Sequence, residues 1–468
     1  MARTPGGTIS SFTLLSTPDE PTITSVTTSI GSASVAFTAP TDVGDAAVSS
    51  YVVTAVDESS GASTGATGSA SPITVTPPAG GTFKIRMQAL NAYGPGRLTE
   101  YDTGNVIYSG AELYAWGSEA GGALGTNNSV RRSSPTQVGA LTTWASVSMS
   151  RFSLGVTTSG TLFAWGYNTN GNLGLNNRVD VSSPVQVGAL TNWSQASSGA
   201  THAPLTHTSV AVKTNGTLWA WGANNHGEVG DSTVYARSSP VQIGSSTNWA
   251  AASTGSGMSI AVTTAGSLYS WGDNVSGQLG LNIADKRSSP VQIGALTNWA
   301  NVSVGKQFVL AVKTDNTLWG WGSGSGGKLG FLPAPNQSSP VQVGSDSNWS
   351  KVSNGWGSDH ALAVRTNGTL WAWGLNTYGV LGINTITARS SPTQVGSLTT
   401  WLSPSSDRDH SLATKSDGTL WGWGRNSQGE VGDNTIIARS SPVQVGALTS
   451  WVSVAAGAYR TLALRGVV

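Results

Sequence analysis

The side chains that could do chemistry are few and widely spaced. The 468 residues include 24 lysines and arginines, 23 aspartates and glutamates, 5 histidines and no cysteine. The lack of cysteine excludes disulfides, thiolate metal sites and cysteine catalysis. Acidic residues neighbour a histidine only in Asp359-His360 and Asp409-His410, and the sequence contains no nucleophile elbow, Walker loop or His-Glu-x-x-His motif. We therefore expect no catalytic residues, and the chain is predicted not to be an enzyme.

Metal ions and cofactors are not expected either. The loop residues Asp231, Asp273 and Asp433 are isolated candidates for contact with calcium. We do not expect them to form a site, because calcium takes about six to eight oxygen ligands. Paired carboxylates of the kind that glycoside hydrolysis requires are not found at a repeated catalytic spacing.

Charge and hydropathy exclude several classes of partner. The formal net charge is +1 and the basic residues form no cluster, so nucleic acids and anionic membranes are not expected partners. No run approaches the roughly 20 apolar residues of a membrane-spanning helix, and the first residues lack the apolar stretch of a secretory signal. We expect a chain that begins in a cytoplasm and is not inserted in a membrane.

A tryptophan repeat organises residues 107–468. Trp-Gly pairs recur about every fifty residues, and a second tryptophan follows each first one after 28 residues. A typical unit reads Trp-Gly-x-Asn-x-x-Gly-x-Leu-Gly, then Ser-Ser-Pro-Val, and its other half alternates apolar and polar residues around an Asn-Gly or Asp-Gly turn. Such turns between alternating runs indicate β-hairpins, so each unit is predicted to be a small antiparallel sheet. The pairs begin at Trp116, Trp165, Trp221, Trp271, Trp321, Trp373 and Trp423.

Two incomplete units at the ends of this region predict how it closes. Residues 112–117 supply only the second half of a unit, and residues 452–464 supply only the first half. Pairing the two ends predicts an all-β, seven-bladed β-propeller that is sealed without a covalent link. The Trp-Gly signature, the Ser-Ser-Pro-Val segment and the count of seven resemble the regulator of chromosome condensation (alpha-tubulin suppressor-like) repeats, which form seven-bladed propellers. The resemblance covers about residues 108–468.

Residues 18–106 differ in texture and are predicted to form a separate domain. They lack tryptophan, and their alternating segments suit the strands of a two-sheet sandwich. The pattern resembles a fibronectin type III domain, which is an Ig-like β-sandwich. That family usually has a tyrosine where this chain has Phe83, so no tyrosine corner is expected. Residues 1–17 form a separate N-terminal segment, in which Thr8 to Ser16 is either frayed or packed on its own domain, or a strand donated to a partner.

Length variation between the repeats locates a candidate binding face. Because the second tryptophan always follows after 28 residues, every length change falls between it and the next Trp-Gly pair, and the extra residues cluster before the alternating strand. Equivalent loops of a propeller emerge on one face, and loops on a rigid scaffold often hold recognition residues. Seven unrelated solvated loops are the alternative. The candidate binding residues are Arg151, Phe152, His202, His207, Lys306, Phe308, Trp356, Asp359, Arg408, Asp409, Tyr459 and Arg460.

The resemblance suggests a structural or adhesive protein. Fibronectin-like modules joined to such propellers resemble virion proteins of tailed marine phages. This implies a tail or capsid appendage located in the virion and assembled in the host cytoplasm, with the sandwich as mount and the propeller as displayed head. Its expected partners are other virion or surface proteins, while a homo-oligomer and a cell-surface glycan as ligand stay open. One alternative is a soluble, cytoplasmic protein-interaction propeller of guanine-nucleotide-exchange-factor type, although the sequence shows no basic N-terminal tail and no inserted wedge hairpin. The other alternative is a carbohydrate-binding adhesin.

Overall fold

The computed structural model consists of two compact units. One comprises residues 1–110 with 467–468, and the other comprises residues 111–466. The structure describes residues 16–29, 32–57, 61–77, 81–107, 110–200, 207–332, 335–355 and 357–467. Of the predicted segment from Thr8 to Ser16, residues 8–15 lie outside the described residues. Regular structure in these ranges is almost entirely strand, which confirms the expected all-β class.

The first unit contains two antiparallel sheets. One has the strand order β1-β2-β5 and the other has the order β4-β3-β6-β7. The bounds are β1 (Thr22–Ser29), β2 (Ser32–Thr38), β3 (Ser50–Asp57), β4 (Ser63–Gly68), β5 (Ile73–Val75), β6 (Gly81–Asn91) and β7 (Gly94–Ile107).

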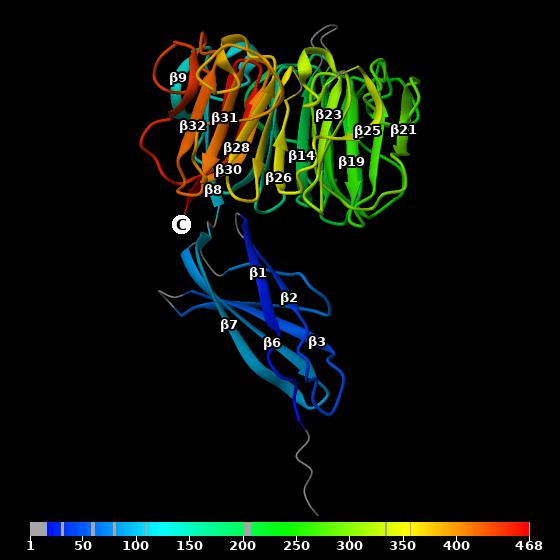
Figure 1. Cartoon of the computed structure of the whole chain (residues 1–468), viewed down its shortest axis with the longest axis vertical. Helices are drawn as coiled ribbons and strands as arrows, with labels where there is room; N and C mark the ends of the chain where they lie inside the picture. The colour runs from blue at the N-terminus through cyan, green and yellow to red at the C-terminus, as the bar shows by residue number, and fades with distance from the viewer. Residues whose placement is uncertain are drawn as a thin grey trace, which may run out of the picture. The chain divides into compact units, whose positions relative to one another are not determined.

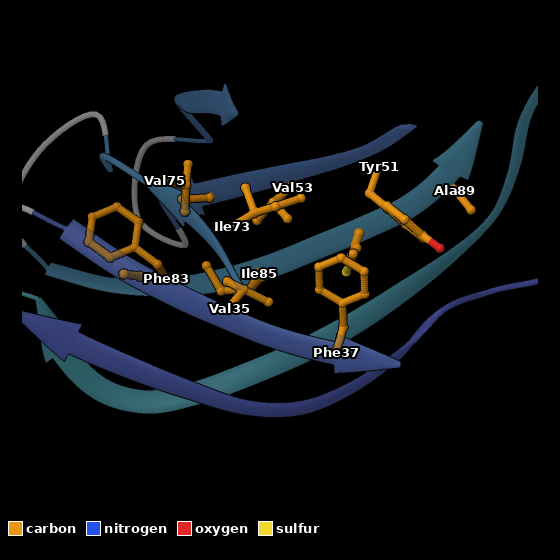
Figure 2. Packing of buried hydrophobic residues seen from close by; sticks show 12 residues of the cluster. Val35, Phe37, Tyr51, Val53, Ile73, Val75, Phe83, Ile85 and Ala89 are labelled. Carbon is orange, nitrogen blue, oxygen red and sulfur yellow. The ribbon is translucent and has the colours of Figure 1, made fainter. Parts of the chain in front are cut away.

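Alternating burial along these strands builds the core of the first unit. Every second residue of β3 is buried, because successive side chains of a strand point to opposite faces. Figure 2 shows Val35 and Phe37 of β2 meeting the buried side chains of β3 and β6. The rings of Phe37 and Tyr51 lie 4.5 Å apart between centroids. Phe83 is fully buried, so its ring contributes to this core.

The second unit repeats one sheet design. Its described strands form seven four-stranded antiparallel sheets, six in chain order and one in the order β34-β35-β8-β9. Strands from the end of the chain therefore pair with strands from the start of the region (Figure 1), as the incomplete end units predict. The sheets comprise β10 (Trp144–Met149), β11 (Phe152–Thr157), β12 (Leu162–Gly166) and β13 (Val181–Gln186); β14 (Trp193–Ala200), β15 (His207–Lys213), β16 (Leu218–Gly222) and β17 (Arg237–Gln242); β18 (Trp249–Thr254), β19 (Met258–Thr263), β20 (Leu268–Gly272) and β21 (Arg287–Gln292); β22 (Trp299–Val304), β23 (Phe308–Lys313), β24 (Leu318–Gly322) and β25 (Gln337–Gln342); β26 (Trp349–Ser353), β27 (His360–Arg365), β28 (Leu370–Gly374) and β29 (Arg389–Gln394); β30 (Trp401–Asp407), β31 (His410–Lys415), β32 (Leu420–Gly424) and β33 (Arg439–Gln444); and β34 (Trp451–Gly457), β35 (Arg460–Val467), β8 (Gly110–Gly117) and β9 (Arg132–Gln137). Three short 3₁₀ turns, η1 (Ala120–Gly122), η2 (Ser325–Gly327) and η3 (Thr377–Gly379), follow the third strands of their sheets.

The first tryptophan of each repeat joins neighbouring sheets. Each indole is fully buried, and its Nε1–H donates to a backbone carbonyl oxygen of the adjacent repeat over 2.8 to 3.1 Å. Trp116 makes this bond to the carbonyl of Glu430, so the set also spans the junction between the two ends of the chain. The conserved spacing of the repeat thus produces an uninterrupted series of identical contacts.

The buried indole of each repeat also requires a glycine of the Trp-Gly signature in the preceding repeat. Gly330 has φ +85°, and a Cβ built there would lie 2.9 Å from Nε1 of Trp373. Both the left-handed backbone and the close indole favour glycine, which has no Cβ. The glycine nine residues after each Trp-Gly tryptophan therefore belongs to the packing between sheets.

Candidate functional site

The loops that hold the predicted binding residues join the first strand of a sheet to its second. Lys306 precedes β23, Asp359 precedes β27, and Arg408 and Asp409 lie between β30 and β31. Since the sheets repeat one design, these equivalent loops emerge at the same end of the sheets. We call this end the loop face.

Only part of the predicted set is exposed on the loop face. Phe152 and Phe308 have no exposed surface, and His207 and Arg460 are 2% and 3% exposed. Each of these four begins a strand whose side chains pack inward, which corrects the expectation that they face a partner. Arg460 instead donates to the backbone oxygen of the half-buried Arg151 over 3.2 Å. His202 and Trp356 lie outside the described residues.

A pocket of about 340 Å³ brings four of the predicted residues together. Lys306, Asp359, Arg408 and Asp409 line it, at the loops of three consecutive repeats. Other lining residues, which the sequence analysis missed, include Arg425 and Tyr378. The pocket therefore brings five charged side chains together in a chain of which only 10% is charged.

One wall of the pocket is a carboxylate held between two lysines. Asp359 Oδ2 accepts from Lys306 Nζ over 3.0 Å, and Asp359 Oδ1 accepts from Lys328 Nζ over 2.9 Å. Burial acts to raise the pKa of Asp359, but Lys328 and Lys306 outweigh it and hold that pKa below 3.8. Burial lowers the pKa of Lys328, and Asp359 offsets part of that effect. This trio has one negative and two positive groups.

A second trio of the same charge pattern lies in the next repeat. Asp409 Oδ2 is 3.2 Å from an Arg425 guanidinium nitrogen and 3.5 Å from Nε of Arg408. Both guanidinium groups stack on the ring of Tyr459, at 4.5 Å for Arg425 and 4.9 Å for Arg408. Burial acts to lower the pKa of Arg425, but bonding to Asp409 and Tyr459 raises it overall. The ring fixes the two cations beside each other.

The two histidines behind these aspartates serve the scaffold. His360 lies 2.9 Å through Nδ1 from Ser358 Oγ and 2.9 Å through Nε2 from Ser411 Oγ. His410 lies 3.1 Å through Nε2 from Thr461 Oγ1. Burial lowers the pKa of His360 to about 4 and that of His410 to about 3, so both rings are neutral near pH 7. Their contacts tie each repeat to the next.

A buried carboxyl group holds the loop that borders the pocket. Asp407 is fully buried, and its Oδ1 accepts from the backbone N–H of Gly357, a pocket residue, over 3.2 Å. Burial raises the pKa of Asp407 to about 7, although the amides of Gly357 and Arg408 oppose that shift. Five other repeats have glycine six residues after the second tryptophan, where Asp407 stands. This departure from the repeat was not recognised in the sequence analysis.

Within the described ranges, histidine, aspartate and glutamate side chains do not gather in threes to suit a metal ion. The helices of the described part are too short to cross a bilayer.

Comparison with known families gives matches in the repeat region. The model of the RCC1-like domain matches residues 206–467, and the model of the regulator of chromosome condensation (RCC1) repeat matches residues 159–203. A search of curated proteins finds no match.

Solved structures share the fold of this region at low identity. Human WBSCR16 has 20% identity and a TM-score of 0.67, covering 76% of this chain and 99% of its own. Yeast RCC1 (Prp20) bound to Kap60 has 18% identity and a TM-score of 0.67, covering 77% and 89%. Prp20p of Saccharomyces cerevisiae, described with its binding to Gsp1p and histones, has 17% identity and a TM-score of 0.66, covering 77% and 92%. At these identities the likeness concerns the fold.

Proposed function

Because the chain belongs to the RCC1-like domain family, we propose that it is a protein-interaction module that binds its partner through the loop face. The single observation that supports this surface is the pocket, where Lys306, Arg408 and Arg425 surround two aspartates in a chain with little charge elsewhere. Charged and aromatic groups at such loops favour recognition of a partner. Yeast RCC1 (Prp20), which shares the fold, has been solved in complex with a protein, Kap60.

The architecture behind this proposal is a seven-bladed propeller joined to a fibronectin type III-like sandwich. Seven four-stranded sheets and the closing pair of β35 with β8 support the propeller. Sheets of three and four strands packed around one core support the sandwich. A rigid ring suits recognition, because it holds the loops in fixed positions.

We propose that the module is not an enzyme. The buried histidines bond within the scaffold, and their lowered pKa values leave them poor proton acceptors at neutral pH. A more specific version of the protein-interaction function is nucleotide exchange on a small GTPase. In the described part of the second unit every strand belongs to one of the seven sheets, so the described residues add no separate hairpin. Release of a fluorescent GDP analogue from a panel of small GTPases tests that form directly.

The virion role stays a prediction without support from the comparisons. The structural relatives named here are human and yeast proteins. A partner in a phage particle, a virion location and a homo-oligomer are therefore left to particle fractionation and sedimentation.

Quantitative affinity capture from the source lysate tests the loop face. The full chain is compared with the double variant Lys306→Glu/Arg408→Glu, and Arg178→Glu, an exposed arginine away from the pocket, is the matched control. We expect a partner that the wild type and Arg178→Glu enrich and that the double variant loses. An identical captured set for all three folded proteins would remove the loop face from the proposal.

A further inference from the structure

The pocket on the loop face has a surplus of positive charge. Each trio has two cations around one aspartate. The pocket of about 340 Å³ is lined by three of these cations, Lys306, Arg408 and Arg425, and by both aspartates, whereas Lys328 is buried behind Asp359 and does not line it. Two further acids lie near it, Asp407 and Glu430, and burial raises the pKa of both. The pocket therefore favours an anionic group, which the arginine and lysine side chains bind with charge-assisted hydrogen bonds.

An exposed aromatic ring stands at the rim in a strained backbone conformation. Tyr378 is the middle residue of η3 and has φ +65°, while the middle residues of η1 and η2 are Gly121 and Gly326 with φ +72°. A bulky residue in the left-handed region costs about 1 to 2 kcal/mol. Tyr378 is nonetheless 44% exposed, so burial of the ring in the core does not explain the strain.

We propose that this pocket binds a sugar acid, with its carboxylate at the cations and its ring against Tyr378. The flat, exposed ring suits the apolar face of a pyranose, and Tyr378 is also 5.5 Å from the Arg425 guanidinium. Thr377 and the two aspartates of the trios supply polar atoms for hydroxyl groups. The volume is at the lower end of the range for small-ligand sites and admits one saccharide unit.

This ligand class goes beyond the protein partner proposed above and does not depend on it. The cations alone would accept any small anion, whereas the pairing with an exposed ring distinguishes a sugar acid from phosphate. A glutamate side chain of a protein partner would bind the cations without contacting the Tyr378 ring. The two components can therefore be separated by experiment.

Ligand-observed NMR with the full chain provides the test. The probes are N-acetylneuraminic acid and glucuronic acid, with glucose as the neutral control, inorganic phosphate as the anion control and a glutamate-rich peptide as the protein control. We expect dissociation constants in about the millimolar range for the sugar acids, as is usual for ligands of this size. Glucose should bind at least about ten-fold more weakly, and the sugar-acid signal should fall with added salt.

Two variants separate the charge from the ring. Tyr378→Asn keeps a residue that tolerates a positive φ, and Lys306→Gln leaves Lys328 to hold Asp359. Each should weaken sugar-acid binding about ten-fold, while Arg178→Gln leaves it unchanged. Phosphate binding should respond to Lys306→Gln alone.

Three results would overturn the inference. The first is no sugar-acid signal at about ten times the expected dissociation constant. The second is equal binding of phosphate and sugar acids with no effect of Tyr378→Asn, which would leave a general anion site. The third is binding of the peptide alone, lost in Lys306→Gln, which would assign the pocket to the protein partner and leave the proposed function intact.

Discussion

Replacing Asp407 by asparagine should make the protein gain stability relative to the wild type as the pH rises, because the variant lacks a buried carboxyl that ionises. Burial raises the pKa of Asp407 from 3.8 to about 7. A carboxyl whose pKa is raised in the folded state stabilises that state while protonated, so the stability is full below pH 3.8 and is lost as the pH rises through 7. Each pH unit between the two values costs about 1.4 kcal/mol, which gives about 4 kcal/mol over the whole window.

The asparagine variant removes this dependence and keeps the loop contact. Its Oδ1 can still accept from the N–H of Gly357, which Asp407 binds over 3.2 Å. The buried amide adds a cost of about 1 to 3 kcal/mol at every pH. We therefore expect the difference in unfolding free energy, Asp407→Asn minus wild type, to rise by about 2 to 3 kcal/mol between pH 5 and pH 8.

Urea unfolding followed by tryptophan fluorescence at pH 5, 6, 7 and 8 measures this difference. Glu119, whose pKa burial also raises to about 7, is present in both proteins and cancels. Asp285→Asn, at an aspartate whose side chain is 79% exposed, is the matched control and should show no such rise. A difference that stays constant from pH 5 to pH 8 would refute the reasoning, because the buried carboxyl would then ionise without penalty.

Two further predictions concern the scaffold. Gly418→Ala should lower the unfolding free energy by more than about 2 kcal/mol in chemical denaturation, because a Cβ there would overlap the carbonyl of Thr449. The control Gly446→Ala has a similar φ but open space around the Cβ, so it should cost only about 1 kcal/mol. Equal losses in the two variants would contradict the contact argument. Trp116→Ala and Trp321→Ala should each lower the unfolding free energy by about 3 to 5 kcal/mol. Only Trp116→Ala should speed hydrogen exchange in β35, because Trp116 lies in the sheet that pairs the chain ends. Equal exchange rates in both variants would show that closure does not depend on this indole.

Most of the repeat architecture could be predicted because it depends on local pattern. The turn at Asn215-Gly216 joins β15 and β16, and Val212 pairs with Leu218 across it, as an Asn-Gly hairpin implies. The half units at 112–117 and 452–464 predicted the pairing of β8 with β35. These features follow from the period and from glycine positions, which a single sequence displays.

The candidate site was predicted only in part, because its contacts join different repeats. Asp359 binds Lys328, which lies 31 residues before it, and spacing does not show that two loops meet. The orientation of side chains was also missed. Phe308 follows the loop residues Lys306 and Gln307, but it is already the first residue of a fully buried strand and points inward.

Residues that differ from the other repeats at an equivalent position are a further signal in the sequence. The candidate residues were chosen by the loop that holds them, so this signal was missed. Six repeats supply an internal reference for what the scaffold needs at each position. Asp407 stands where five other repeats have glycine. At the position of Tyr378 the two repeats that share its 3₁₀ turn have glycine, whereas the other four repeats have Asn170, His226, Ser276 and Gln428. Asp407 buries a carboxyl and Tyr378 strains the backbone, so neither is explained by stability. Both border one pocket, through Gly357 and the ring of Tyr378 itself. Costs of the same two kinds also occur in other repeats, at the buried carboxyl of Glu119 and at Ser232 with φ +65°. What distinguishes this pocket is that both kinds meet at one place, as a ligand that uses the pocket would explain.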